Sequence, residues 1–258
     1  MFDSGIGGLS ILKALRAELP FEDFVYLADA GHAPYGERDD AHVIGRSRVI
    51  TQYLLAEYGI KALVIACNTA TAAAIHLLRE AHPALAIIGV EPALKPAVAL
   101  SHTRRIGVMA TRGTLGSAKF RSLLEFLAGQ ADFICQPCDG LADAIEHEDT
   151  TKIIALCADY TRAMGQFGTK DGEIDTLVLG CTHYAFARDH LTTMAGPDVR
   201  LIDNGEPVAR QTRRMLKTLS PGDTPGRCVL LTTGERTTLQ NAAQHWLSLD
   251  CPVESLRI

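Results

Sequence analysis

The sequence has no long apolar run and no excess of basic residues. Its longest apolar stretches, such as Ala62 to Cys67, fall far short of the roughly 18 residues that a membrane-spanning helix needs. The 25 Lys and Arg residues are outnumbered by 30 Asp and Glu residues, which gives a formal charge of −5, whereas a surface that binds nucleic acid needs a basic face. We therefore expect neither a membrane nor a nucleic acid as a partner.

A targeting signal and a paired cysteine motif are also missing. The first residues, Met1 to Ser4, contain no basic segment followed by an apolar one, so we expect no signal peptide and a cytoplasmic location. Seven cysteines are an odd number in a chain of 258 residues, and in a reducing cytosol we expect them to be thiols. Cys135 and Cys138 form a single CxxC pair without the second pair typical of a zinc site, so we expect no metal.

The residues that are present follow the alternating pattern of an α/β protein. Apolar residues make up 47% of the chain and charged residues 21%, which is ordinary for a globular protein of one or two domains. Continuous apolar runs, typical of buried parallel strands, occupy residues 24–28, 62–66, 86–90, 106–110, 133–135, 176–179, 199–202 and 229–231. Amphipathic segments between them predict helices at 9–19, 43–58, 117–128, 151–167, 206–219 and 237–248. This order indicates parallel sheets, either in two doubly wound domains or in one TIM barrel.

An internal repeat favours two domains. The segment KALVIACNTA (61–70) resembles DTLVLGCTHY (175–184), and each places a cysteine, Cys67 or Cys181, after a predicted strand and before a predicted helix. A repeat with this spacing suggests a duplicated domain. We therefore predict two doubly wound, mostly parallel-sheet α/β domains related by pseudo-symmetry.

Turn-like segments at 91–92 and 204–207 suggest where the chain passes between these domains. Residues 1–92 and 208–258 would then form the first domain, and residues 93–207 the second. Because ligands of open α/β sheets bind beyond the carboxyl ends of the strands, the two cysteines would lie on opposite walls of one cleft. The alternative is that two core cysteines occupy similar strands by chance.

Two thiols that face one substrate permit a specific chemistry. Helix N-termini stabilise thiolates and can hold carboxylates, so one thiolate could take a proton from a carbon while the other thiol returns one from the opposite face. The product is the mirror image, and no group leaves, so we expect no cofactor. A proton beside a carboxylate is far less acidic than a thiol with a pKa of about 8.5, so the site must exclude water and stabilise charge. Asp3 and His183 are candidates to assist the proton transfers.

The glycine-rich segment after Asp3 is a weaker signal. Gly5, Gly7 and Gly8 resemble a dinucleotide-binding fingerprint only loosely, because the third glycine of that fingerprint is not at the required spacing. A cradle for a carboxylate fits this segment better.

Taken together, motifs over residues 2 to about 207 resemble those of glutamate racemases, cofactor-independent enzymes that supply D-glutamate for bacterial peptidoglycan. They are FDSGIGGL (2–9), PYG (34–36), ACNTA (66–70), EP (91–92), ATRGT (110–114) and LGCTHY (179–184). The DSG and GCTH motifs distinguish this group from aspartate and hydantoin racemases. The resemblance implies two α/β domains with the active site between them, glutamate as a small-molecule substrate, and a homodimer.

The resemblance also implies roles for individual residues. Cys67 and Cys181 match the two catalytic acids and bases, and Asp3 and His183 match residues that assist them. The positions that match glutamate-binding residues are Asp3, Ser4, Tyr35, Gly36, Asn68, Thr69, Thr111, Thr114, Thr182 and His183. Glu146 is a weaker match to a glutamate near the site.

Two alternatives and one departure accompany the resemblance. The alternatives are a racemase of a related substrate, such as aspartate, a hydantoin or another small diacid, and a binding role that inhibits DNA gyrase. The departure is that related chains carry several residues before the counterpart of Phe2. We therefore expect a short first strand, a poorly anchored Asp3, a less well paired neighbouring strand, and lower stability than in a chain with a longer first strand.

Overall fold

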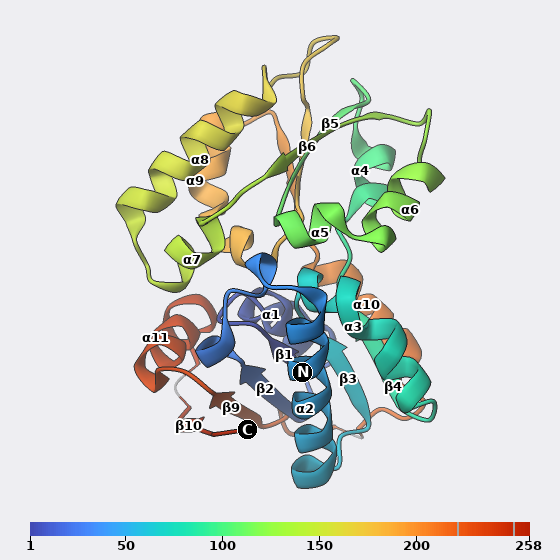
Figure 1. The fold of residues 1–258 in the computed structure, drawn as a ribbon, viewed down its shortest axis with the longest axis vertical. Helices are drawn as coiled ribbons and strands as arrows, with labels where there is room; N and C mark the ends of the chain where they lie inside the picture. Colours follow the sequence, from blue (N-terminus) through green and yellow to red (C-terminus); the bar gives the residue numbers. More distant parts are fainter. Residues whose placement is uncertain (221, 250) are drawn as a thin grey trace. The chain divides into compact units, whose positions relative to one another are not determined.

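The computed structural model describes residues 1–220, 222–249 and 251–258, and the chain divides into two compact units. Unit 1 consists of Met1–Val90 and Gly205–Ile258, and unit 2 of Glu91–Asn204. Each unit is built on its own parallel sheet, with strand order β10-β9-β2-β1-β3-β4 in unit 1 and β6-β5-β7-β8 in unit 2 (Figure 1). Two open sheets with crossover connections are the predicted α/β fold, so the TIM-barrel alternative is wrong.

Unit 1 has a six-stranded sheet with helices on both faces. Its strands are β1 (Phe2–Asp3), β2 (Phe24–Ala28), β3 (Ala62–Ile65), β4 (Ala86–Gly89), β9 (Cys228–Thr232) and β10 (Val253–Ser255). Its helices are α1 (Leu9–Glu18), η1 (Ala30–His32), η2 (Tyr35–Glu37), α2 (Asp40–Tyr58), α3 (Asn68–Ala81), α10 (Gly205–Met215) and α11 (Arg236–Leu247), where η denotes a 3-10 helix. Figure 1 shows α2 in front of the sheet and α1 behind it. Helices α2 and α3 pack together on one face, and α1 packs against α10 and α11.

Unit 2 has a four-stranded sheet. Its strands are β5 (Arg105–Ala110), β6 (Asp132–Pro137), β7 (Thr176–Leu179) and β8 (Arg200–Ile202). Its helices are α4 (Leu94–Leu100), α5 (Arg112–Gly116), α6 (Ala118–Phe126), α7 (Leu141–Glu146), α8 (Thr150–Met164), η3 (Thr182–Ala187) and α9 (Arg188–Ala195). Ile106, Val108 and Val178, from the two central strands, pack with α4 and α6 in one buried core.

The first strand is short, as expected, yet Asp3 at its end is firmly held. The strand pairs with β2 at two positions and with β3 at one, between Phe2 and Ile65. Asp3 is fully buried, and its carboxylate accepts hydrogen bonds from the backbone N–H groups of Ser4, at 2.8 Å, and Gly8. The expectation that Asp3 would be poorly anchored is therefore wrong, because the following turn supplies the donors that the short strand does not.

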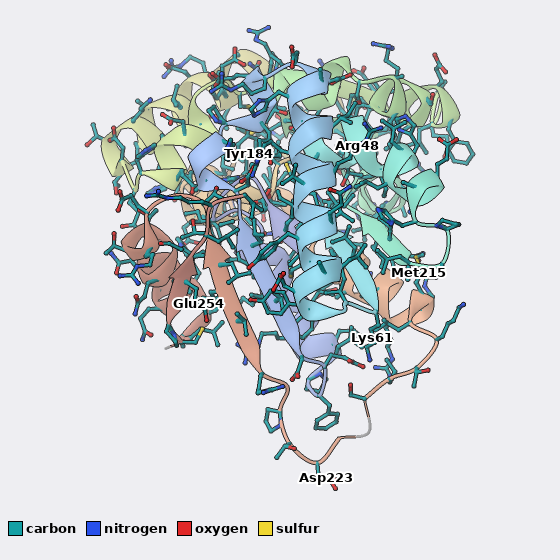
Figure 2. All side chains as sticks on the ribbon, turned by 60° about the horizontal axis from the view of Figure 1, so that its bottom comes forward. Arg48, Lys61, Tyr184, Met215, Asp223 and Glu254 are labelled. Atoms are coloured by element: carbon teal, nitrogen blue, oxygen red, sulfur yellow. The ribbon has the colours of Figure 1, made fainter. Side chains whose placement is uncertain are left out.

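A loop at the opposite end of unit 1 from these residues is tied to the start of β2. Figure 2 shows Asp223 at the tip of this loop, which joins α10 to β9. Glu22 accepts hydrogen bonds from the backbone N–H and the hydroxyl of Ser220, at 2.7 and 2.8 Å, and forms an ion pair with Lys61. Lys61 also donates to the carbonyl of Thr218. Since the side chain of Glu22 is nearly buried, these contacts fix the base of the loop.

Among the residues that the structure describes, no helix is long and apolar enough to span a membrane.

Candidate active site

Cys67 lies in unit 1 at the junction of β3 and α3. It is the N-cap of α3, and its sulfur accepts the backbone N–H of Ala70 at 3.5 Å and lies 3.9 Å from the Ser4 hydroxyl. Only 5% of the residue is exposed. Because the N-terminus of a helix carries about half a positive charge, this position favours the thiolate that proton abstraction requires.

Asp3 and Ser4 lie beside Cys67 because β1 and β3 are neighbouring strands. The backbone N–H of Ala66 donates to the carbonyl of Phe2 at 2.7 Å, which aligns the ends of the two strands. The Ser4 hydroxyl, 3.4 Å from an Asp3 carboxylate oxygen, also faces the Cys67 sulfur. The carboxylate of Asp3, the hydroxyl of Ser4 and the thiol of Cys67 therefore follow one another at the carboxyl ends of these strands.

The glycine-rich turn does form a cradle, but its anion belongs to the protein. The N–H groups of Ser4 and Gly8 bind the carboxylate of Asp3 itself. The hypothesis that this turn holds a substrate carboxylate is therefore corrected. Gly8 is required there, because a Cβ atom would lie 2.7 Å from Cβ of Asp3 and 2.9 Å from the ring of Tyr26.

Tyr35 and Gly36 lie in the short helix η2, next to the start of α3. The Tyr35 ring is buried in the same core cluster as Cys67, and its hydroxyl donates to the carboxylate of Asp29 at 2.5 Å. The hydroxyl is therefore engaged within the protein. What this loop can offer to a ligand is its main chain at Tyr35 and Gly36.

Asn68 and Thr69 begin α3 and are both buried. The amide group of Asn68 donates to the carbonyl of Val90 at 3.4 Å, while its carbonyl oxygen is buried without a hydrogen-bond partner among the described residues. A buried acceptor of this kind costs free energy unless a ligand or water satisfies it. Next to Cys67, it suits a cationic donor such as an ammonium group.

Cys181 occupies the corresponding place in unit 2, after β7 and Gly180. A Cβ atom at Gly180 would lie 2.9 Å from both the Ala110 side chain and the Met109 carbonyl, so glycine lets this turn approach β5 closely. Cys181 is 8% exposed and precedes η3, a 3-10 helix that leads into α9. The element after Cys181 is thus a tighter helix than its counterpart after Cys67.

His183 connects Cys181 to Glu146. Its Nδ1 lies 3.9 Å from the Cys181 sulfur, and its Nε2 lies 2.7 Å from a carboxylate oxygen of Glu146. Burial lowers the pKa of His183, but the hydrogen bonds and charges of Cys181 and Glu146 outweigh burial and hold this pKa well above its ordinary 6.5. Glu146 ends the six-residue helix α7. The sequence indicated it only through a weak motif match.

Thr111, Thr114 and Thr182 complete the predicted set in unit 2. Thr111 caps α5 at the end of β5 by accepting the backbone N–H of Thr114 at 3.2 Å, and the two hydroxyls lie 3.0 Å apart. Thr182 is buried directly after Cys181. Since β5 pairs with β7, these threonines and the Cys181 turn share the carboxyl end of one sheet, which is where α/β folds bind ligands.

The structure thus gathers the predicted residues into two groups, one in each unit. Each group has a cysteine, a hydrogen-bonding neighbour for its sulfur and a carboxylate next to that neighbour: Ser4 with Asp3 in unit 1, and His183 with Glu146 in unit 2. Within the described ranges, no group of three or more His, Cys, Asp and Glu side chains could hold a metal ion.

We expect the His183–Glu146 pair to stabilise unit 2 most at low pH. A pKa above the unfolded value of about 6.5 means that the contribution is fully present below pH 6.5 and is lost as pH rises through the folded-state pKa. Glu146→Gln should therefore lower the free energy of unfolding by about 1–3 kcal/mol at pH 6, and the difference should narrow in alkaline solution. Denaturant unfolding from pH 6 to 10 measures it.

The exposed pair of His147 and Asp143, 3.3 Å apart, provides the control. Asp143→Asn should change stability little at any of these pH values, because exposed ion pairs contribute little. A Glu146→Gln effect that is independent of pH would contradict a charged, paired His183.

Comparison with known proteins finds a racemase family and members of it. The family model for Asp/Glu/hydantoin racemases matches residues 10–212. A glutamate racemase of Ralstonia nicotianae is 50% identical over 218 residues, which cover 84% of this chain and 76% of the relative. Another, of Cupriavidus pinatubonensis, is 43% identical over an alignment that covers 100% of this chain and 94% of the relative.

Solved structures of glutamate racemases resemble this structure over nearly the whole chain. Glutamate racemase isoform RacE1 from Bacillus anthracis matches with a TM-score of 0.87 at 29% identity, covering 100% of this chain and 96% of that one. Escherichia coli glutamate racemase, solved with L-glutamate and the activator UDP-MurNAc-Ala, matches with a TM-score of 0.81 at 27% identity, covering 99% of this chain and 96% of that one. The chain belongs to the Asp/Glu/hydantoin racemase family.

Proposed function

We propose that this protein is a glutamate racemase, which interconverts L- and D-glutamate without a cofactor and supplies D-glutamate for peptidoglycan. The observation that carries the proposal is the duplicated arrangement of a buried cysteine at the carboxyl end of a parallel strand, in contact with a polar neighbour, once in each unit. The identity of 50% to a glutamate racemase supports the substrate.

In this proposal the two units are the two domains, and their cysteines act on opposite faces of the glutamate Cα. One thiolate removes the Cα proton and becomes a thiol, and the other thiol delivers its proton to the opposite face and becomes a thiolate. The configuration inverts, and the two sulfur atoms end with their protonation states exchanged. The reverse reaction follows the same path, which is why both directions need both cysteines.

The neighbours of each cysteine have matched tasks in this reaction. Ser4 and Asp3 assist Cys67. His183, held by Glu146, assists Cys181 by stabilising its thiolate. The carbanion that forms at Cα is stabilised by fixed donors rather than by water.

Residues that do not transfer protons hold the substrate. The carbonyl oxygen of Asn68 suits the substrate ammonium group. Hydroxyl and main-chain groups suit its two carboxylates, and they belong to Ser4, Tyr35, Gly36, Thr69, Thr111, Thr114 and Thr182. Asp3 and His183 contact the substrate as well as assisting proton transfer. The similarity to glutamate racemases also supports a cytoplasmic homodimer.

Turnover of glutamate in D2O tests the proposal. The dialysed protein, with no cofactor added, should convert L-glutamate and D-glutamate to the same racemic mixture. Each inversion should replace the Cα proton by deuterium, because the proton delivered comes from a thiol that exchanges with solvent. Polarimetry and proton NMR follow the two events together.

A substrate panel of L-aspartate and a 5-substituted hydantoin serves as the control. We expect glutamate to be preferred by at least tenfold in kcat/KM. Faster turnover of aspartate or the hydantoin would assign the protein to another activity of its family and contradict the proposal.

A further inference from the structure

Asp29 is a buried carboxylate that the proposed reaction does not use. It follows β2, is 0% exposed, and collects donors on both oxygens. One oxygen accepts from a terminal nitrogen of Arg46 at 2.8 Å and from the Thr233 hydroxyl at 2.9 Å. Nδ1 of His32 lies 3.1 Å from the same oxygen. The other accepts from Nε of Arg46 at 2.9 Å and from the Tyr35 hydroxyl at 2.5 Å. The fork of Arg46 thus binds both oxygens, which is the strongest geometry for such a pair.

These partners come from four parts of unit 1. Arg46 lies on α2, Tyr35 on η2 and His32 on η1, and Thr233 follows β9. The turn after Asp29 also packs tightly against the turn at Thr233, because a Cβ atom on Gly31 would lie 2.6 Å from the Thr233 carbonyl oxygen. The backbone N–H of Gly31 donates to the Thr233 hydroxyl at 3.1 Å. Asp29 therefore joins the segment that carries Tyr35 to the rigid sheet.

The protonation states of Asp29 and Tyr35 favour the hydrogen bond between them. Burial raises the pKa of Asp29, but the hydrogen bonds of Arg46 and Tyr35 outweigh it, so the net pKa is lowered and the carboxylate stays ionised. Burial and the Asp29 charge raise the pKa of Tyr35, so its hydroxyl stays protonated and donates. An uncompensated buried charge is costly, so the Tyr35 side chain is held wherever Asp29 and Arg46 place it.

The position of Tyr35 decides where its loop lies relative to Cys67. The Tyr35 ring belongs to the core cluster that contains Cys67 and Ala70, and η2 contacts α3, which Cys67 caps. The ring of His42 stands edge-on to the ring of Tyr35, with 6.1 Å between the ring centroids. A shift of Tyr35 would therefore move the main chain at Tyr35 and Gly36 relative to the thiol.

We propose that Asp29, paired with Arg46, is a positioning residue that fixes the Tyr35–Gly36 loop beside Cys67 through the Tyr35 hydroxyl, so that the loop main chain binds one carboxylate of the substrate. This inference rests on the proposed function and adds to it a residue that touches neither the substrate nor a reacting atom. The loop contributes binding that is equal in the ground state and the transition state. Its loss therefore raises KM and leaves kcat nearly unchanged.

Asp29→Asn and Tyr35→Phe test the proposal together. Asp29→Asn removes the charge that Arg46 and Tyr35 share, and we expect KM for glutamate to rise about tenfold or more, with kcat within about threefold of the parent. Tyr35→Phe removes only one hydroxyl and should raise KM several-fold. In the double variant KM should rise no further than in Asp29→Asn alone, because both changes break the same connection.

Asp23→Asn is the matched control. Asp23 also pairs with an arginine of unit 1, Arg227, at 3.1 Å, but the pair is exposed and lies at the other end of β2. This variant should leave KM and kcat unchanged. An unchanged KM in Asp29→Asn, or KM effects that add in the double variant, would overturn the proposal while leaving glutamate racemisation intact.

Amide hydrogen exchange separates this inference from the proposed function. In Asp29→Asn and Tyr35→Phe, the backbone N–H groups of residues 35–37 should exchange at least tenfold faster than in the parent, and in Asp23→Asn at the parent rate. If the parent protein does not racemise glutamate, the proposed function fails, and this measurement still decides whether Asp29 fixes the loop. Equal exchange in all four proteins would overturn the inference whatever the substrate.

Discussion

Replacing either Cys67 or Cys181 by serine is expected to lower glutamate racemisation by about a thousandfold or more. A positioned acid or base contributes roughly 10²–10⁴ to a rate, and each of these thiols must serve as the base in one direction and the acid in the other. A serine hydroxyl has nearly the same shape but is not ionised near neutral pH, so it can do neither. We expect the loss in both directions and in both variants, measured as kcat/KM from L- and from D-glutamate.

Cys228→Ser provides the control for this experiment. Cys228 begins β9 in unit 1, and burial raises the pKa of its thiol to about 11. The thiol therefore stays protonated near neutral pH and does not act as a base. This variant should keep activity within about twofold of the parent. A Cys67 or Cys181 variant that kept a tenth of the parent activity would show that one thiol suffices, and the two-thiol mechanism would then be wrong.

Gly8→Ala is expected to lower kcat/KM about a hundredfold. The new methyl group would lie 2.7 Å from Cβ of Asp3 and 2.9 Å from the Tyr26 hydroxyl, and both neighbours are fully buried. One of them must move, and Asp3 lies on a strand of two residues. A displacement of about 1 Å at a reacting group can cost roughly 10² in rate, while overpacking costs about 1–3 kcal/mol of stability. Steady-state kinetics and thermal unfolding of the same preparation measure both.

Gly45→Ala is the matched change in the same unit. A Cβ atom at Gly45, inside α2, meets no atom within 4 Å, so this substitution should leave activity unchanged. It should add about 0.5–1 kcal/mol to stability, because alanine loses less conformational freedom in a helix. If Gly8→Ala behaves like Gly45→Ala, the placement of Asp3 is not required for the reaction.

Most strands could be predicted from the sequence because their apolar residues follow one another without interruption. Each of the eight continuous apolar runs contains or overlaps a strand of the structure. Strand β10 (Val253–Ser255) was missed, since only Val253 is buried and an edge strand of three residues leaves no pattern. The short helices α4, α5 and α7 were missed for a similar reason, because one or two turns are too few to show a helical period.

The site could be predicted in part. Both cysteines have a clear local signal, a polar pair directly after a buried strand, and the repeat doubles that signal. Asp29 has the same signal without the repeat, because it follows the apolar run of β2 directly. Its partner Arg46 lies 17 residues further on and Thr233 lies 204 residues away, so the network exists only after the sheet has formed. Hydrogen bonds between residues far apart in the sequence depend on the order of the strands in the sheet, and local residue patterns do not reveal that order.

Unit 1 consists of two separate segments of the chain, and this affects how the protein folds during synthesis. Unit 2 is one continuous segment that ends at Asn204, whereas unit 1 needs residues 205–258 to place β9 beside β2. At about 5–20 residues per second, a ribosome takes roughly 3–10 s to add these residues. During this interval unit 2 has all of its chain, while β2 exposes the edge that β9 later covers. An unpaired edge of this kind can pair with another chain, so the nascent protein is most prone to aggregate while residues 205–258 are being added.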